Sequence, residues 1–282
     1  MLKKNRTGRN LLRMLALLTA FVSLLAFTSC DLSKMMSKSS SQASVKFKVN
    51  GSGCSFYRFK GTSELLTYTV PDFYADKPVT ALLAFSISNA QYLQELAIGK
   101  NIGSIDVWAI TNCPKLKIIK VSKDNKAFKD INGVLYTKSG DKLLVFPNMN
   151  TTGLTIPAGV KEIAANAFYK CGNLKTVKFP AGLQIVGDRA FLKCTALEAV
   201  DLPDGMKKIG SDGFSYCHAM ITVFVPASVT SIGDYGFFDA IKVPAIKMGH
   251  KSEKDLTLGR DWKYKKDANF NSEIPVEWGA SR

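Results

Sequence analysis

Apolar residues recur in the middle of this chain at a constant step of 23 residues. Starting from Ile156, the step reaches Phe179, Leu202 and Val225, and each of these residues is followed by proline. A single unit of this kind cannot bury its own apolar face, whereas stacked units can, so such repetition is typical of solenoid proteins. The same step connects five further columns: Ile163, Val186, Ile209 and Ile232; Phe168, Phe191, Phe214 and Phe237; Cys171, Cys194, Cys217 and Ala240; Leu174, Leu197, Met220 and Val243; and Val177, Val200, Val223 and Ile246.

The repeat extends toward the N-terminus and gives seven units over residues 75–247. One unit, 121–155, has 35 residues instead of 23, and two apolar segments on either side of 138–141 predict a β-hairpin in the insertion. The terminal units of a stack would expose their cores, so caps are expected at both ends. We expect residues 45–74 to form an N-terminal β cap built on a hairpin, and residues 248–282 to form a C-terminal cap.

Within a unit, the segment that precedes the proline has the alternation of a β-strand. Val177 and Phe179 should point inward, while Thr176 and Lys178 point outward. Pro180 should end the strand, because proline cannot donate a hydrogen bond to the ladder. Copies of this strand are expected to form one parallel sheet, with neighbouring strands about 4.8 Å apart. The remainder of each unit should return as a short strand and an irregular or short helical turn.

The segment 160–174, VKEIAANAFYKCGNL, resembles the leucine-rich repeat of the BspA-like bacterial surface antigens almost position by position. The long unit also resembles an insertion that is common in that family. This resemblance covers residues 66–247 and implies a leucine-rich-repeat solenoid: a right-handed superhelix of β/α type with mainly short parallel β-strands. It also implies surface display and adhesion to protein partners, such as host extracellular matrix or other cells, without catalysis.

The first 29 residues are typical of a secretory signal peptide. Residues 1–13 are basic and polar, and residues 14–27 form an uncharged apolar run that is too short to span a bilayer comfortably. The following Phe-Thr-Ser-Cys resembles a bacterial lipobox, so we expect a lipid on Cys30 and a flexible tether, rich in serine and lysine, over residues 30–44. The chain would then reside in the cell envelope, at the outer membrane or cell surface. The alternative is ordinary cleavage that leaves Cys30 as a free thiol.

The formal net charge is +15, and the leader alone carries five basic residues and no acid, so the remainder carries +10. This excess favours anionic surfaces, including phospholipid headgroups and acidic polymers. Nucleic acid is not expected as the partner, because export is predicted and no basic helix or basic motif with interleaved aromatic residues is present.

The cysteines and histidines do not form a catalytic or metal-binding pattern. Cysteines one repeat apart should stack rather than converge, and no C-x-x-C pair is present, so we expect buried apolar filling and no metal or cofactor. Disulfide pairing between neighbouring cysteines in the stack remains open. His218 follows Cys217 directly, but adjacent side chains should point in different directions, which disfavours a nucleophile pair. We therefore do not expect an enzyme.

The outward strand positions are the best candidates for a partner-binding face, because they vary while the core columns repeat. Phe224 is expected to be an exposed aromatic anchor flanked by charge. The alternative is a solvated face with no partner. Two other functions stay open: a structural or self-associating lipoprotein, and an enzyme or inhibitor that uses Asp255, Asp261, Asp267, Glu273 and Glu277 of the C-terminal cap. The candidate face comprises Lys120, Thr176, Lys178, Asp201, Thr222, Phe224 and Lys247.

Overall fold

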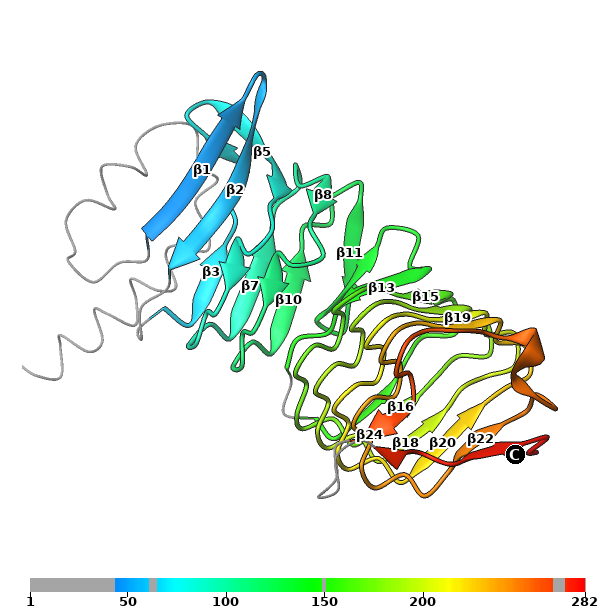
Figure 1. Ribbon diagram of the computed structural model, residues 1–282. Coiled ribbons are helices and arrows are strands. Elements are labelled where there is room, and N and C mark those ends of the chain that lie inside the picture. Colours follow the sequence, from blue (N-terminus) through cyan, green and yellow to red (C-terminus); the bar gives the residue numbers. More distant parts are fainter. Residues whose placement is uncertain (1–43, 61–64, 149–150, 266–271, 282) are drawn as a thin grey trace, which may run out of the picture. The chain divides into compact units, whose positions relative to one another are not determined.

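The structure is a computed structural model that describes residues 44–60, 65–148, 151–265 and 272–281. The predicted signal peptide, Cys30 and Asp267 lie outside these ranges. Residues 43–282 form one compact unit, a β-solenoid whose coils follow one another along the chain (Figure 1). Among the described residues there is no α-helix and one short 3-10 helix, η1 (Glu253–Asp255), so the turns between strands are irregular rather than helical.

The strands that correspond to the predicted repeat strand form three parallel sheets, whereas the repeat predicted one. The 35-residue unit separates the first sheet from the second, because its inserted strands pair elsewhere. The second and third sheets are neighbours that share no ladder. In chain order the sheets are β3 (Thr67–Thr69), β7 (Glu95–Ile98) and β10 (Ile118–Val121); β14 (Gly153–Thr155) and β16 (Thr176–Lys178); and β18 (Ala199–Asp201), β20 (Thr222–Val225), β22 (Ile246–Met248) and β26 (Val276–Trp278).

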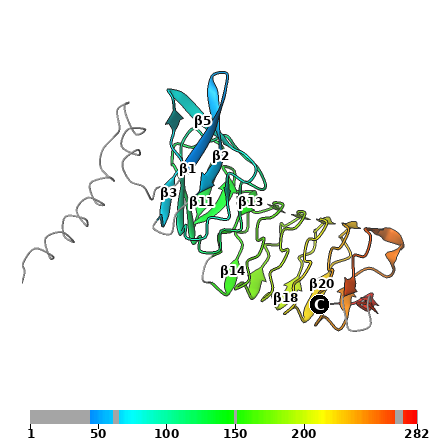
Figure 2. The same ribbon diagram turned by 60° about the vertical axis from the view of Figure 1, so that its left-hand side comes forward.

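A second ladder runs along the returning half of each coil and is continuous through the C-terminal part of the solenoid (Figure 2). Its first three strands are the antiparallel strands of the insertion, and each later coil adds a parallel strand of two residues. The hairpin predicted in the insertion is confirmed. The strands are β11 (Phe128–Ile131), β12 (Val134–Thr137), β13 (Lys142–Val145), β15 (Glu162–Ile163), β17 (Ile185–Val186), β19 (Lys208–Ile209), β21 (Ser231–Ile232) and β23 (Thr257–Leu258).

An antiparallel hairpin, shown in blue in Figure 1, precedes the first coils. Its second strand continues into a parallel pairing with β5, which joins the hairpin to the solenoid. Two short pairings complete the described strands. The hairpin is β1 (Ser44–Asn50) and β2 (Gly53–Lys60), its sheet also contains β4 (Phe73–Tyr74), β5 (Lys77–Leu82) and β8 (Ser104–Ile105), and the short pairs are β6 (Ile87–Ser88) with β9 (Ile110–Thr111) and β24 (Tyr264–Lys265) with β25 (Ser272–Glu273).

The repeated phenylalanines form a continuous ring stack inside the solenoid, as the sequence predicts. Phe168, Phe191, Phe214 and Phe237 are fully buried, and the centroids of neighbouring rings lie 4.5 to 5.3 Å apart with interplanar angles of 5° to 9°. Phe146 of the long unit extends this stack, with its centroid 4.9 Å from that of Phe168. The column therefore crosses the point where the sequence period is interrupted.

A second periodic feature is a column of glycines that brings successive coils into close contact. Gly187, Gly210 and Gly233 recur at the repeat step. A Cβ atom on Gly210 would lie 2.5 Å from the backbone nitrogen of Asp188, and one on Gly233 would lie 2.5 Å from that of Ser211. Real Cβ atoms do not approach this closely, so these positions accept only glycine without a backbone shift.

Asn125 joins the long unit to the coil before it. Its side chain is fully buried, and its Nδ2 donates to the carbonyl oxygens of Gly99 and Ile102 at 2.8 and 2.9 Å. Its Oδ1 accepts from the backbone nitrogens of Ala127 and Phe128 at 2.9 and 2.8 Å. All four hydrogen-bonding positions of the buried amide are thereby satisfied, as burial of a polar group requires.

The described residues include no helix with the length and hydropathy that a bilayer-spanning segment needs.

Candidate partner-binding face

The outward side chains of strands β16, β18, β20 and β22 form the strand face, which we define by Thr176, Lys178, Asp201, Thr222, Phe224 and Lys247. Five of these six side chains are exposed, and Phe224 is half-buried. The intervening positions point into the core: Val200 and Val223 are fully buried. The two-residue alternation of a strand therefore separates a repeated core from a varied surface.

Strand register places three residues of the strand face in one row. Asp201 of β18 is paired with Phe224 of β20, and Phe224 is paired with Lys247 of β22. Lys247 is in turn paired with Glu277 of β26, which adds a fourth exposed position to the row. Neighbouring strands lie about 4.8 Å apart, so the row is an acid, an aromatic ring, a base and an acid at regular spacing.

Phe224 differs from its prediction, because it is half-buried rather than exposed. It lies on β20, which has a neighbouring strand on each side, and the side chains of Asp201 and Lys247 flank it. Side chains on the two neighbouring strands each cover part of the Phe224 ring, so the ring is less exposed than it would be on an edge strand. The ring still reaches the surface, but it presents only part of its area to a partner.

Lys120 does not belong with the other candidates, although the sequence placed it in the same column. It lies on β10, in the first of the three sheets, on the other side of the 35-residue unit from β16. Its Nζ forms an ion pair with Glu95 Oε1 at 2.7 Å. The insertion therefore divides the predicted column, and the strand face extends only over the C-terminal coils.

The stacked cysteines are buried free thiols. Burial raises the pKa of Cys171 and of Cys217 to about 12, and it raises the pKa of Cys194 well above its ordinary value. Because a thiol must ionise to act as a nucleophile, these groups are unreactive near neutral pH. The described residues contain no group of three or more histidine, cysteine or acidic side chains that could hold a metal ion.

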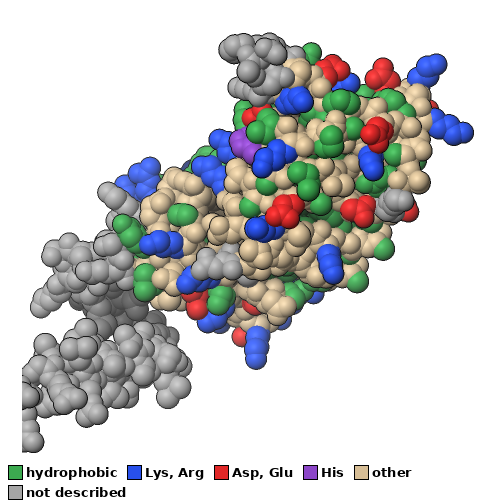
Figure 3. All heavy atoms as spheres, turned by 90° about the horizontal axis from the view of Figure 1, so that it is seen from below, with side chains coloured by type: hydrophobic (Ala, Val, Ile, Leu, Met, Phe, Trp, Pro, Cys, Tyr) green, Lys and Arg blue, Asp and Glu red, His purple; other side chains and the backbone are tan. Residues whose placement is uncertain are grey.

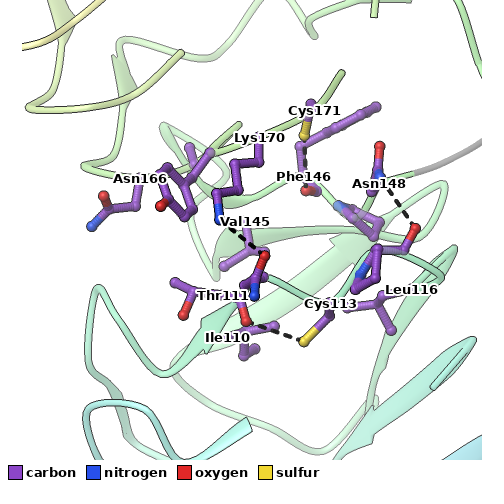
Figure 4. A pocket seen from close by; sticks show the side chains of 15 residues that line it. Ile110, Thr111, Cys113, Leu116, Val145, Phe146, Asn148, Asn166, Lys170 and Cys171 are labelled. Atoms are coloured by element: carbon purple, nitrogen blue, oxygen red, sulfur yellow. Dashed lines mark hydrogen bonds between the residues drawn. The ribbon is translucent and has the colours of Figure 1, made fainter. Parts of the chain in front are cut away.

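A cavity of about 190 Å³ lies where the long unit meets the coils on either side of it (Figure 4). Lys170 extends across it and its Nζ donates to Asn112 Oδ1 at 3.2 Å, while the sulfurs of Cys113 and Cys171 lie on its walls. Burial raises the pKa of Cys113 to about 11. No histidine or acidic side chain is among the described residues that line this cavity, and its titratable groups are Lys170, Tyr169 and the two cysteines.

The acidic residues that the structure describes in the C-terminal segment line neither of the two described cavities. Glu273 forms an ion pair with Lys263 at 2.7 Å, and Asp255 and Glu277 are exposed. Asp261 is half-buried and lines neither of the two described cavities. The geometry therefore gives no support to the alternative of an enzyme with its site in this segment.

Sequence reasoning missed one polar pair beside the stack. His218 Nε2 lies 3.2 Å from Asp239 Oδ2, and the Tyr216 ring packs edge-on against the His218 ring. The adjacent Cys217 points into the core, as expected for neighbouring residues in this turn. One signal could have indicated this pair. Asp239 lies one repeat beyond Tyr216, so stacking of the coils places it next to Tyr216 and near His218.

The sequence model of one protein family, the BspA type leucine rich repeat region, matches residues 33–132 and 144–254 of this chain, in six copies. Among solved structures, the pneumococcal vaccine antigen PcpA is similar with 22% identity and a TM-score of 0.60, over 70% of this chain and 51% of that one. A leucine-rich repeat protein from Eubacterium ventriosum is 21% identical with a TM-score of 0.48, over 70% of this chain and 64% of that one. No curated protein matches the chain.

The chain thus spans about half the length of the pneumococcal antigen, and the likeness to that structure shows the fold. The family match covers well over half of the chain and includes both the N-terminal coils and the strand face. The chain therefore belongs to the BspA type leucine rich repeat family.

Proposed function

We propose that this protein is a non-catalytic binding module displayed at a bacterial cell surface, and that it holds a protein partner on the strand face. Membership of the family supports this proposal, because solenoids of this kind offer long faces for interaction. Figure 3 shows basic and acidic side chains interspersed over one side of the molecule, without a large field of one sign. Recognition would then depend on local patterns rather than on bulk charge.

The row Asp201–Phe224–Lys247 is the observation that carries the proposal. The three residues occupy equivalent outward positions of adjacent coils, and they differ in chemical type, whereas the core columns repeat one type of residue. Aromatic residues flanked by charge are frequent anchors of interfaces. A partner that contacts this row would bury the exposed part of the Phe224 ring and place polar groups against both neighbours.

The test uses residues 43–282, immobilised and exposed separately to purified extracellular matrix proteins and to whole host cells. We expect the wild-type fragment to retain one of these, and the double variant Phe224→Ala, Lys178→Ala to retain at least tenfold less, since losing one interface anchor costs more than about 1.4 kcal/mol. The matched control is Tyr92→Ala with Lys208→Ala, which removes an exposed aromatic ring and an exposed lysine elsewhere. Equal retention by both variants would refute the strand face.

We also propose that the protein is anchored through a lipid on Cys30. The basic leader, the short apolar run and the lipobox-like sequence support this assignment. A Cys30→Ser variant, expressed in a bacterium that processes lipoproteins, should lose incorporation of labelled fatty acid and move from the membrane fraction to the soluble fraction. A variant that stays in the membrane fraction would contradict the anchor.

Self-association is a second candidate function. Strands β3 and β26 are terminal strands of their parallel sheets in the described part of the chain, and terminal strands are templates for pairing with another chain. Sedimentation of residues 43–282 over a range of concentrations distinguishes the two functions. A monomer at all concentrations would remove self-association.

A further inference from the structure

The N-terminal hairpin has a basic outer face that the solenoid fold does not require. Its inner face packs against the core: Val45 and Phe47 are half-buried, and the Phe47 ring contacts the Phe56 ring edge-on at 5.3 Å. Between these apolar positions, Lys46 and Lys48 point outward and are exposed. On the partner strand Arg58 is exposed as well. We call Lys46, Lys48 and Arg58 the hairpin basic face.

The register of the hairpin brings like charges together. Lys46 of β1 is directly paired with Arg58 of β2, and Lys48 lies two residues further along the same side of β1. Directly opposed like charges destabilise a strand pair. No acidic side chain among the described residues forms an ion pair with any of the three. This arrangement lowers the stability of the hairpin without contributing to its packing.

Elsewhere in the molecule, neighbouring strands place opposite charges together. Lys142 and Glu162 are paired across β13 and β15 and form an ion pair at 2.7 Å. Lys120 and Glu95 lie on the adjacent strands β10 and β7 and are also 2.7 Å apart. The hairpin basic face therefore departs from a pattern that the same chain follows in its coils. Residues that lower the stability of their own strand pair without contributing to packing are expected at positions with a functional role.

The hairpin is also the part of the solenoid that is nearest in the chain to Cys30. Residues 31–43 separate Cys30 from the first residue of β1, and 13 residues reach at most about 45 Å when fully extended. If Cys30 carries a lipid, the first residue of β1 is held within this distance of the bilayer surface, and the hairpin basic face begins two residues further along the strand. The beginning of the solenoid is then the region most often exposed to lipid headgroups.

We infer that the hairpin basic face binds anionic phospholipid headgroups and holds the first coils against the membrane. This inference rests on the proposed anchor at Cys30. Basic side chains close to an anionic bilayer each strengthen adsorption by about fivefold. Tyr57, an exposed residue in the bulge opposite Lys46 and Phe47, adds an amphipathic ring of the type found at membrane interfaces.

The test measures the partition of residues 43–282 onto vesicles of phosphatidylcholine, with and without phosphatidylglycerol. The fragment lacks Cys30, so its binding does not depend on acylation. We expect binding only to the phosphatidylglycerol vesicles, weakened by added salt. Lys46→Gln with Lys48→Gln should reduce the partition coefficient about 25-fold. Thermal unfolding checks the fold, and the double variant should be no less stable than wild type, because it removes like-charge repulsion.

The matched control is Lys207→Gln with Lys208→Gln, which removes the same charge from exposed positions on a distant coil. This control should bind like wild type. Equal losses in the two variants would show an effect of net charge and overturn the inference. Absence of wild-type binding to phosphatidylglycerol, or binding to heparin without binding to lipid, would overturn it too. Fatty-acid labelling of Cys30 is measured independently, so failure of the hairpin basic face and failure of the anchor give different results.

Discussion

The thiol of Cys194 donates a hydrogen bond to the backbone oxygen of Phe168 in the preceding coil, over an Sγ–O distance of 3.1 Å. Cys217 repeats this contact one coil later with the oxygen of Phe191, at 3.3 Å. Each of these carbonyl oxygens also accepts from a backbone nitrogen of its own coil: Phe168 O from Cys171 N at 3.0 Å, and Phe191 O from Cys194 N at 3.1 Å. The cysteine column therefore supplies a second donor to carbonyl groups beside the phenylalanine stack, in addition to filling small spaces in the core.

These thiols predict how stability depends on alkaline pH. In the folded protein the pKa of Cys171 and of Cys217 is about 12, against an ordinary value of 9.0, because burial disfavours the thiolate. Between these values the unfolded chain releases protons that the folded chain keeps, so the free energy of unfolding should fall as pH rises. Each such thiol steepens the fall by about 1 kcal/mol per pH unit. Urea denaturation from pH 8 to about pH 11 measures it.

The control for this prediction is Cys217→Ala, which removes one of the titrating thiols. Its stability should be lower than that of wild type near pH 8, and its slope above pH 9 should be shallower by the contribution of one thiol. Identical slopes in the two proteins would mean that Cys217 ionises as easily in the folded state as in the unfolded state. That result would contradict the buried position of the Cys217 side chain.

Phe191 is expected to be costly to remove from the stack. Its ring lies between those of Phe168 and Phe214, at 4.5 and 5.0 Å, and it is fully buried. Phe191→Ala should destabilise the protein by about 3–5 kcal/mol, because it removes buried area and leaves a cavity between rigid coils. Chemical denaturation measures the change. Phe224→Ala, at a half-buried position, should cost less than half as much, and a similar loss in both variants would contradict the assignment of the two environments.

Much of the core could be predicted from the sequence, because each coil repeats the same packing problem. A residue that recurs at one step must occupy the same place in every coil, so the columns of Ile163, Phe168 and Cys171 identify their own positions. The glycine column at Gly187 and Gly210 gives an equally regular signal. It was missed because glycine is usually associated with turns, whereas here it permits close approach of two backbones.

Other features depend on contacts that a period does not encode. The position of Phe146 in the ring stack follows from how the insertion folds, and the insertion interrupts the frame from which a position could be counted. The same interruption separates Lys120 from the strand face. The role of Asn125 is not encoded in the period either, since two of its four hydrogen bonds go to backbone carbonyl groups of the preceding coil.

The turns of the solenoid contain residues in left-handed backbone conformation that are not glycine. Lys170, Lys193 and Tyr216 recur at the repeat step with φ of 61°, 62° and 59°. Such a conformation costs an ordinary residue about 1–2 kcal/mol. Lys193→Gly should therefore change the stability by less than about 0.5 kcal/mol, because the relief of strain offsets the lost contact of Lys193 with the Tyr216 ring and the greater freedom of glycine in the unfolded chain. The shift in the urea midpoint measures this change.

The comparison variant is Lys178→Gly, at an exposed position of strand β16. Here the backbone is extended and glycine offers no relief of strain, so the variant should lose about 0.5–1 kcal/mol. If both glycine variants were destabilised by the same amount, the left-handed conformation of Lys193 would be contradicted.

Gly210→Ala tests the close approach of successive coils. A Cβ atom there would meet the backbone of Asp188, which cannot move aside without disturbing the ladder between β17 and β19. We expect a loss of about 3 kcal/mol, at the upper end of the usual range for overpacking. Gly159→Ala is the matched control, because its Cβ would meet no atom within 4 Å. That variant should be neutral or more stable by about 0.4–1 kcal/mol, since alanine restricts the unfolded chain. A loss of stability in Gly210→Ala together with no loss in Gly159→Ala would show a steric requirement for glycine at position 210. Similar small changes in both variants would contradict it, because a Cβ atom on residue 210 would then lie further than 2.5 Å from the backbone nitrogen of Asp188.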